Sequence, residues 1–392
     1  MKSRNRAVSF LANMGLLAFS LLFFEFALQV ASVFFEWREH DAQGFRNASA
    51  LDSAAIVALG DSHTYGTSVS SKEAWPSILS ARLGEDVYNM GLGGYGPARN
   101  NDNLPTAIEL KPRWIIFGLY FGNDFYDDFQ FAQKNGRLSE FAPDDVLREI
   151  SELENQRTIA EEVGFLFNRG GRNRDVATDR PPSEVLGPPG FLRVVGNWLT
   201  THSRLYGLAR VLTIRLDYDA EFNALLARDF DKAKAKLTDR QLPFVSFYDG
   251  RDWQTIFTSP YRFRVMDLAD PRIRTGIEIS KHMLEQMRLR VSESGAKYLV
   301  LLLPTKEYVF WPRVENPNQH KLLAELAQDE DRIRNEIKRY MQDHGIDFVD
   351  PVPELRQSER QPYFPDGDGH PNALGHQIIA KKILEFIKGN QI

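Results

Sequence analysis

The chain alternates short apolar runs with longer amphipathic stretches, and this alternation restricts its possible folds more than any other feature. Most of the apolar runs are continuously apolar rather than alternating, which is typical of parallel strands covered by helices on both faces. The pattern predicts a three-layer, doubly wound, mostly parallel α/β sheet. The runs predicted as strands are 54–60, 86–92, 113–122, 243–249, 297–304 and 346–350.

Amphipathic stretches between these runs are predicted as helices. The stretch 276–295 places Ile277, Leu284, Met287 and Val291 at the spacing of one helix face. The stretch 322–345 ends on Gly345, a residue type that often stops a helix. Two further helices are predicted at 74–84 and 372–389.

The N-terminal residues have the pattern of a membrane anchor. Basic residues at 2, 4 and 6 precede a long apolar stretch that continues to Trp37. About 20 mostly apolar residues cross a bilayer as a helix, and basic residues keep their end in the cytoplasm. We expect an uncleaved, single-pass anchor in the cell membrane at 1–37, a linker at 38–53 and an extracytoplasmic domain at 54–390. A cleaved signal peptide and a buried soluble helix are the alternatives.

The region 125–240 interrupts the strand–helix rhythm. It contains an acidic stretch with a helical pattern at 144–163, followed by a stretch rich in Gly, Pro and Arg at 168–190. The second stretch has few side chains to bury and is predicted as a long exposed loop. We interpret 125–240 as an insertion on the side of the domain, serving as a lid or a docking surface.

Composition excludes several classes of function. The formal net charge is −5 and no long basic block is present, so a nucleic acid partner is not expected. The chain has no cysteine, which excludes disulfides, thiolate zinc sites and cysteine nucleophiles. Nothing in the sequence calls for a cofactor.

Polar residues gather where predicted strands end. In open α/β sheets, ligands bind outside the carboxyl ends of the strands, so we expect these polar segments to converge. They are "GDSHTYG" (60–66), "NMGLGGYG" (89–96), "FGNDFYDD" (121–128) and, before the last helix, "FPDGDGHPNALGH" (364–376).

Ser62 is the candidate nucleophile. A free serine hydroxyl is weakly nucleophilic and needs a base. His370, in a loop bounded by Gly and Pro, is the best candidate for that base. An acid should hold its imidazole in the right tautomer, and Asp368 and Asp366 lie two and four residues before it.

An oxyanion formed at Ser62 needs hydrogen-bond donors. The backbone N–H groups of Ser62 and Gly94 and the side-chain amide of Asn123 are the candidates. Gly94 suits this role because a glycine lets the backbone approach a substrate closely. Alternatively, Gly93 and Gly94 form only a tight loop, and Asn123 with Asp124 only caps a helix.

Two other interpretations of the histidine-containing segments remain open. His63 and His376 compete with His370 for the role of base. Asp366, Asp368 and His370 also carry the oxygen and nitrogen donors of a metal site, although we expect no metal.

The order of the four segments resembles that of the SGNH (GDSL-like) hydrolase superfamily. "GDSHTYG" is similar to its first block, "NMGLGG" to its second, "GND" to its third and "DGDGHPN" to its last, and the likeness covers 54–130 and 296–388. The resemblance implies an SGNH hydrolase-like, flavodoxin-like fold. It also implies that Ser62 is the nucleophile, that Gly94 and Asn123 complete the oxyanion hole, and that His370 is the base.

One departure concerns the acid. The commonest pattern of the superfamily is Asp-x-x-His, but Gly367 stands three residues before His370 and the spacing here is Asp368-x-His370. This spacing, with "LLLPTKEYVF" (301–310), resembles a branch that includes membrane-anchored bacterial proteins of polysaccharide O-acetylation. We therefore predict Asp368 as the orienting acid, with Asp366 in reserve.

The predicted function is an extracytoplasmic, serine-dependent O-acyl ester hydrolase acting on an envelope polysaccharide or glycolipid. One alternative is an O-acyltransferase that works with a membrane-bound O-acyltransferase, and another is a non-catalytic, sugar-binding assembly factor. Tyr95, Asp124 and Lys306 are the candidate substrate contacts: an aromatic ring stacks on sugars, and a lysine holds an anionic group.

Overall fold

The computed structural model of the chain describes residue 20 and residues 40–41, 43–156, 228–239, 241–314 and 320–390. Within these ranges, no helix combines the length and the apolar character needed to cross a bilayer. The predicted anchor at 1–37 lies outside them apart from residue 20, and the predicted exposed loop at 168–190 lies outside them entirely.

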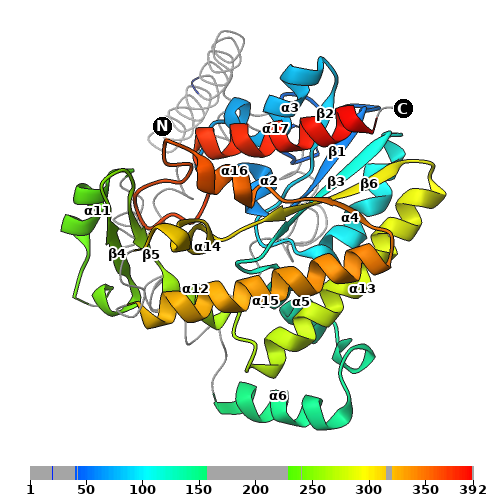
Figure 1. Cartoon of the computed structure of the whole chain (residues 1–392). Helices are drawn as coiled ribbons and strands as arrows, with labels where there is room; N and C mark the ends of the chain where they lie inside the picture. The colour runs from blue at the N-terminus through cyan, green and yellow to red at the C-terminus, as the bar shows by residue number, and fades with distance from the viewer. Residues whose placement is uncertain are drawn as a thin grey trace, which may run out of the picture.

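A five-stranded sheet forms the centre of the molecule (Figure 1), and each strand runs parallel to its neighbours. The strand order β2-β1-β3-β6-β7 is the flavodoxin-like order, with the change of direction between β1 and β3. The predicted parallel sheet is therefore confirmed. Its strands are β1 (Ile56–Gly60), β2 (Val87–Asn89), β3 (Trp114–Tyr120), β6 (Lys297–Leu303) and β7 (Asp347–Val349).

Helices cover both faces of this sheet (Figure 1). Side chains alternate along a strand, so Val57 and Leu59 of β1 pack against α4, α5, α13 and α15 on one face, while Ile56 and Ala58 pack against α3 and α17 on the other. The four predicted helices correspond to α3, α13, α15 and α17. The covering helices are α3 (Trp75–Leu83), α4 (Pro97–Glu109), α5 (Asp124–Lys134), α13 (Pro271–Glu293), α15 (Lys321–Asp343) and α17 (Ala373–Gly389).

The contact between α5 and α13 is unusually close. A Cβ atom on Gly276 of α13 would lie 2.0 Å from the carbonyl oxygen of Phe125 in α5, so only glycine fits there. The contact fixes the first turn of α5, which directly follows Asn123.

The predicted strand at 243–249 does not join the main sheet, so that placement is wrong. It forms β4 (Ser246–Asp249), which pairs antiparallel with β5 (Gln254–Phe257) in a separate two-stranded sheet. The side chains of β4 are half-buried or exposed, whereas an inner strand of a parallel sheet is buried on both faces. Strand β5 was not predicted. Phe230 and Ala233 of α11 (Phe230–Lys236) pack against Ile256 of β5.

The described part of the predicted insertion contributes helices. The acidic stretch begins as α6 (Asp144–Gln156), which packs against α13 through Ile150. Within the described residues, the other short helices are α2 (Ser62–Tyr65), α12 (Ser259–Arg264), α14 (Lys306–Phe310) and α16 (Val352–Gln357), with the 3₁₀ helices η1 (Ser71–Glu73), η2 (Leu138–Glu140), η4 (Leu242–Phe244) and η5 (Trp311–Arg313).

Candidate active site

A tight turn presents Ser62 at the carboxyl end of β1. Strand β1 ends at Gly60, whose φ is +145° and where a Cβ atom would lie 2.3 Å from Thr64 Oγ1, so the turn requires glycine. Asp61 then caps α2 by accepting a hydrogen bond from the His63 N–H at 2.8 Å. Ser62 is thereby the first residue of α2, at the switch point of the sheet.

The imidazole of His370 lies between Ser62 and Asp368. The Nε2 atom of His370 is 2.8 Å from Ser62 Oγ, although the two residues are 308 positions apart. The Nδ1 atom is 2.6 Å from Asp368 Oδ1, which also accepts the His370 backbone N–H at 3.0 Å. With its proton on Nδ1, the ring donates to Asp368 and leaves Nε2 free to accept the serine hydroxyl proton.

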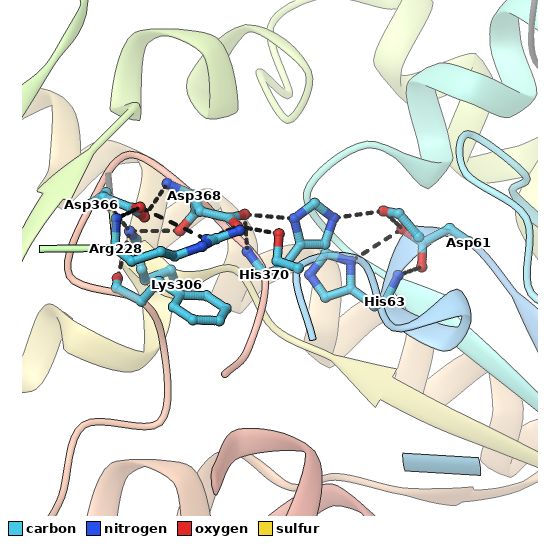
Figure 2. Close-up of polar contacts among 10 residues, drawn as sticks. Asp61, His63, Arg228, Lys306, Asp366, Asp368 and His370 are labelled. Atoms are coloured by element: carbon cyan, nitrogen blue, oxygen red, sulfur yellow. Dashed lines mark hydrogen bonds and ion pairs between the residues drawn. The ribbon is translucent and has the colours of Figure 1, made fainter. Parts of the chain in front are cut away.

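The two candidate acids have different environments (Figure 2). Asp368 Oδ2 accepts hydrogen bonds from Ser68 Oγ and Arg228 Nη1, each at 2.5 Å. Burial alone raises the pKa of Asp368, but His370, Arg228 and Ser68 more than offset it and hold this pKa well below its ordinary value. Asp366 accepts the backbone N–H groups of Arg228 at 2.6 Å and Asp368 at 3.1 Å. The geometry thus places Asp368, and not Asp366, against the imidazole.

The two competing histidines have other hydrogen-bond partners than Ser62, although the His63 ring lies 4.6 Å from the His370 ring between centroids. His63 is buried, with Nδ1 3.2 Å from Asp61 Oδ2 and its ring stacked on Tyr120 at a centroid distance of 3.6 Å. Burial lowers the pKa of His63. His376 lies inside α17, where its Nδ1 accepts the Trp75 N–H at 3.3 Å and burial lowers its pKa to about 3. Because Ser62 Oγ is hydrogen-bonded to His370, the structure favours His370 among the three.

Of the segments predicted to form the oxyanion hole, the Gly93–Gly94 loop lies beside Ser62, and Asn123 follows the neighbouring strand. A Cβ atom on Gly93 would be 4.0 Å from Ser62 Cβ, and Gly94 has a φ of +72°, which favours glycine. Asn123 follows β3, the neighbour of β1, and is the N-cap residue of α5. Its side-chain amide donates to the Asp127 carboxylate. An amide has two N–H groups, so this bond leaves one of them for a substrate.

The prediction that Lys306 holds an anionic substrate is wrong. Lys306 is fully buried, and its ammonium donates to the carbonyl oxygens of Asp366 at 2.7 Å, Asp368 at 2.8 Å and Phe364 at 3.4 Å. These contacts take up the three donors of an ammonium group. Lys306 therefore binds the backbone of the loop that carries Asp368 and His370. Burial lowers the pKa of Lys306 to about 8.

Replacing Lys306 by methionine is expected to destabilise the protein by about 2 kcal/mol at neutral pH, because three buried carbonyls lose their donor. The unfolded chain keeps a lysine pKa near 10.4, so between about pH 8 and 10.4 the unfolded wild type binds more protons than the folded one. The stability that Lys306 gives the wild type thus rises with pH across this interval. The difference in free energy of unfolding between the wild type and K306M should therefore grow there by about 3 kcal/mol.

Urea unfolding of both proteins at several pH values measures this difference. Lys381→Met, at an exposed position of α17, is the matched control and should change stability by less than about 0.5 kcal/mol. A deficit of K306M that stays constant from pH 7 to pH 10.4 would contradict the expectation.

Two other predicted substrate contacts are also wrong. Asp124 is fully buried and accepts the Tyr120 N–H at 2.8 Å. Burial, together with the nearby carboxylates of Asp61 and Asp127, raises the pKa of Asp124 well above its ordinary value. The Tyr95 side chain is only 5% exposed, and the Arg99 guanidinium lies over its ring at 5.0 Å. Both side chains therefore support the loops from within.

The metal interpretation gains no support from the described residues. Among them, no group of three or more His, Asp and Glu side chains is placed to hold a metal ion. Asp366 and Asp368 instead face the donors of Arg228 and of the loop backbone.

Three residues beside the site were not predicted. Ser68 and Arg228 contact the second oxygen of Asp368. The buried Arg262 of α12 donates to the carbonyl of Gly122 at 3.1 Å, and a Cβ atom on Gly369 would lie 2.6 Å from its Nη2 atom. Arg262 thus connects the loop before Asn123 with the loop before His370. The only sequence signal was the position of Ser68 shortly after the first motif, since both arginines lie in the region without a motif.

Comparisons with known proteins place few constraints on the chain. No family model matches the sequence, and no curated protein matches it. Among solved structures, a GDSL-like lipase from Bacteroides thetaiotaomicron is similar, with 10% identity, 86% of this chain and 88% of the other covered, and a TM-score of 0.36. A catalytic mutant of an acetylxylan esterase from Geobacillus stearothermophilus has 11% identity, coverage of 86% and 95%, and a TM-score of 0.36. Similarity this weak supports no statement about activity.

Proposed function

We propose that the protein is a serine-dependent O-acyl ester hydrolase that acts outside the cytoplasm on an acylated envelope polysaccharide or glycolipid. The main evidence is a pair of hydrogen bonds, one from Ser62 Oγ to His370 Nε2 at 2.8 Å and one from His370 Nδ1 to Asp368 Oδ1 at 2.6 Å. A serine, a base and an orienting acid in this order are the parts that acyl transfer needs.

The proposed reaction has two steps. Ser62 Oγ attacks the ester carbonyl while His370 Nε2 takes the hydroxyl proton, and the oxyanion accepts hydrogen bonds from Ser62 N–H, Gly94 N–H and the Asn123 amide. The intermediate collapses to an acyl-serine, and His370 returns the proton to the departing alcohol. Water then attacks the acyl-serine with His370 as base, which releases the carboxylic acid and restores the serine.

One observation supports a location at the envelope, and a second supports a carbohydrate substrate. The pattern of 1–37 predicts an anchor with the domain outside. A depression of about 530 Å³ is lined by Ser68, which contacts Asp368, and by Phe364, although Ser62, Asp368 and His370 do not line it themselves. Its other lining side chains include hydrogen-bonding groups suited to hydroxyls, namely Glu73, Arg360, Gln361 and Gln377.

A fluorophosphonate probe tests the proposal directly. The folded protein should be phosphonylated at Ser62, as shown by peptide mass spectrometry, and should hydrolyse 4-nitrophenyl acetate. Labelling that is absent, or that occurs without preference for Ser62, would favour the non-catalytic alternative.

The same preparation separates hydrolysis from transfer. Acetyl ester turnover is measured with and without a polysaccharide acceptor. Free acetate as the product in both cases supports the hydrolase. If the acceptor speeds turnover and acetylated polysaccharide is the product, the hydrolase proposal fails, and the protein is the O-acyltransferase that works with a membrane-bound O-acyltransferase.

A further inference from the structure

Arg228 contacts both acidic residues of the loop before His370 (Figure 2). Its Nη1 atom is 2.5 Å from Asp368 Oδ2 and 3.7 Å from Asp366 Oδ2. Its backbone N–H donates to Asp366 Oδ2 at 2.6 Å. The guanidinium also lies over the ring of Phe364, with 4.0 Å between its Cζ atom and the ring centroid. Arg228 thus contacts the loop at 364–370, here called the acid loop, in three ways: through its backbone N–H, through its positive charge and through the flat face of its guanidinium group.

The backbone of Arg228 is strained in a way that serves these contacts. Its φ is +59°, a left-handed conformation that is unfavourable for a non-glycine residue. Such a conformation persists where surrounding contacts impose it. Here the N–H and the guanidinium are both directed at neighbouring carboxylates, which indicates that the position is fixed by the acid loop.

The two oxygens of Asp368 have separate partners. Oδ1 accepts from the backbone N–H and the imidazole of His370, whereas Oδ2 accepts from Ser68 and Arg228. A carboxylate opposite an imidazole stabilises the imidazolium that forms when the base takes a proton. A guanidinium on the other oxygen draws on the same negative charge, so it opposes this stabilisation.

We propose that Arg228 is a positioning residue that fixes Asp368 behind His370 and weakens its hold on the protonated imidazole, so that the base stays unprotonated to lower pH. This inference rests on the proposed esterase function. The charged and titratable groups facing Asp368, His370 and the loop between them are Arg228, Lys306, Asp366, Asp61, His63, His376 and Arg262. Among the side chains on the second oxygen, Arg228 alone brings a positive charge, while Ser68 brings a neutral hydroxyl.

The side chain of Arg228 is 37% exposed, so solvent screens part of its charge. We therefore expect a moderate effect. The rate of Ser62 labelling by fluorophosphonate falls as the pH is lowered, and this fall is the acid limb of the pH profile. In Arg228→Gln, the acid limb should move to higher pH by about 0.5 to 1 pH unit. Arg228→Lys keeps the charge and should keep the wild-type limb, with a plateau rate lowered less than about tenfold.

Ser68→Ala is the matched variant, because it removes a partner of the same oxygen without removing a charge. Its acid limb should move by less than half of the change in R228Q. Arg251→Gln, at an exposed turn between β4 and β5, should leave both limb and plateau unchanged. An unchanged limb in R228Q, or equal shifts in R228Q and S68A, would overturn the inference and assign Arg228 a packing role only.

A second readout does not depend on catalysis. The His370 ring in the full chain, carrying ¹³C-labelled histidine, is titrated by NMR in the wild type, R228Q and R228K, with His370→Gln used to assign its signal. R228Q should shift the titration midpoint upward and R228K should not. If wild-type Ser62 is not labelled at any pH, the proposed function fails, and this titration still decides the role of Arg228.

Discussion

Replacing Ser62 by alanine is expected to lower the rate of ester hydrolysis by about 10⁶-fold, the loss seen when the nucleophile of a serine triad is removed. The hydroxyl of Ser62 is the atom hydrogen-bonded to His370 Nε2, and alanine leaves the base with nothing to deprotonate. The oxyanion donors remain in place, so a residual rate above that of water alone should persist.

The rate of 4-nitrophenyl acetate hydrolysis by wild type and S62A measures this loss, and urea unfolding of both proteins checks that the fold is intact. Ser294→Ala is the matched control, because Ser294 caps the end of α13 next to the amino end of β6, away from the catalytic edge. It should retain the wild-type rate. An S62A variant within tenfold of wild type would mean that another residue carries the reaction.

Replacing Asp368 by asparagine is expected to lower the rate by about 10⁴-fold. Asparagine can turn an N–H toward His370 Nδ1, which favours the tautomer whose Nε2 carries the proton and cannot accept another. The change also removes the negative charge that Arg228 contacts at 2.5 Å. Both effects act on the imidazole and not on the binding of substrate, so kcat should fall while KM changes little.

Asp366→Asn is the control for this prediction. Asp366 accepts two backbone N–H groups, and an amide oxygen keeps part of that function, so we expect a loss of no more than about tenfold. A larger loss in D366N than in D368N would reverse the assignment of the acid. The pair of variants therefore resolves the ambiguity that the Asp366-Gly-Asp368-Gly-His370 spacing leaves in the sequence.

The main sheet could be predicted from the sequence because its strands are apolar on both faces. Leu299 to Leu303, for example, is a continuous apolar run, and its side chains are buried against helices on alternating faces. The run at 243–249 is also rich in apolar and aromatic residues, but its pairing with β5 depends on a contact across a short turn. Apolar character identifies a strand without identifying its partner.

The approach of Ser62 to His370 could also be predicted, because both lie in loops at one edge of a parallel sheet. The surrounding charges could not. Lys306 follows a strand end as a substrate-binding lysine would, and only the fold shows that the loop at 364–368 covers its ammonium. Arg228 lies in a stretch without periodicity, so its place beside Asp368 depends on long-range packing that no local pattern records.

The reactive centre joins two ends of the domain that are 308 positions apart. During synthesis, the serine is complete long before the loop carrying its base has been made, and a serine without a base is inert. A product that stops before residue 370 would have the hydroxyl of Ser62 but would lack the imidazole that activates it. Under the proposed esterase function, a growing chain gains ester-cleaving activity only after the loop carrying His370 has been made, so an incomplete chain cannot attack the esters around it.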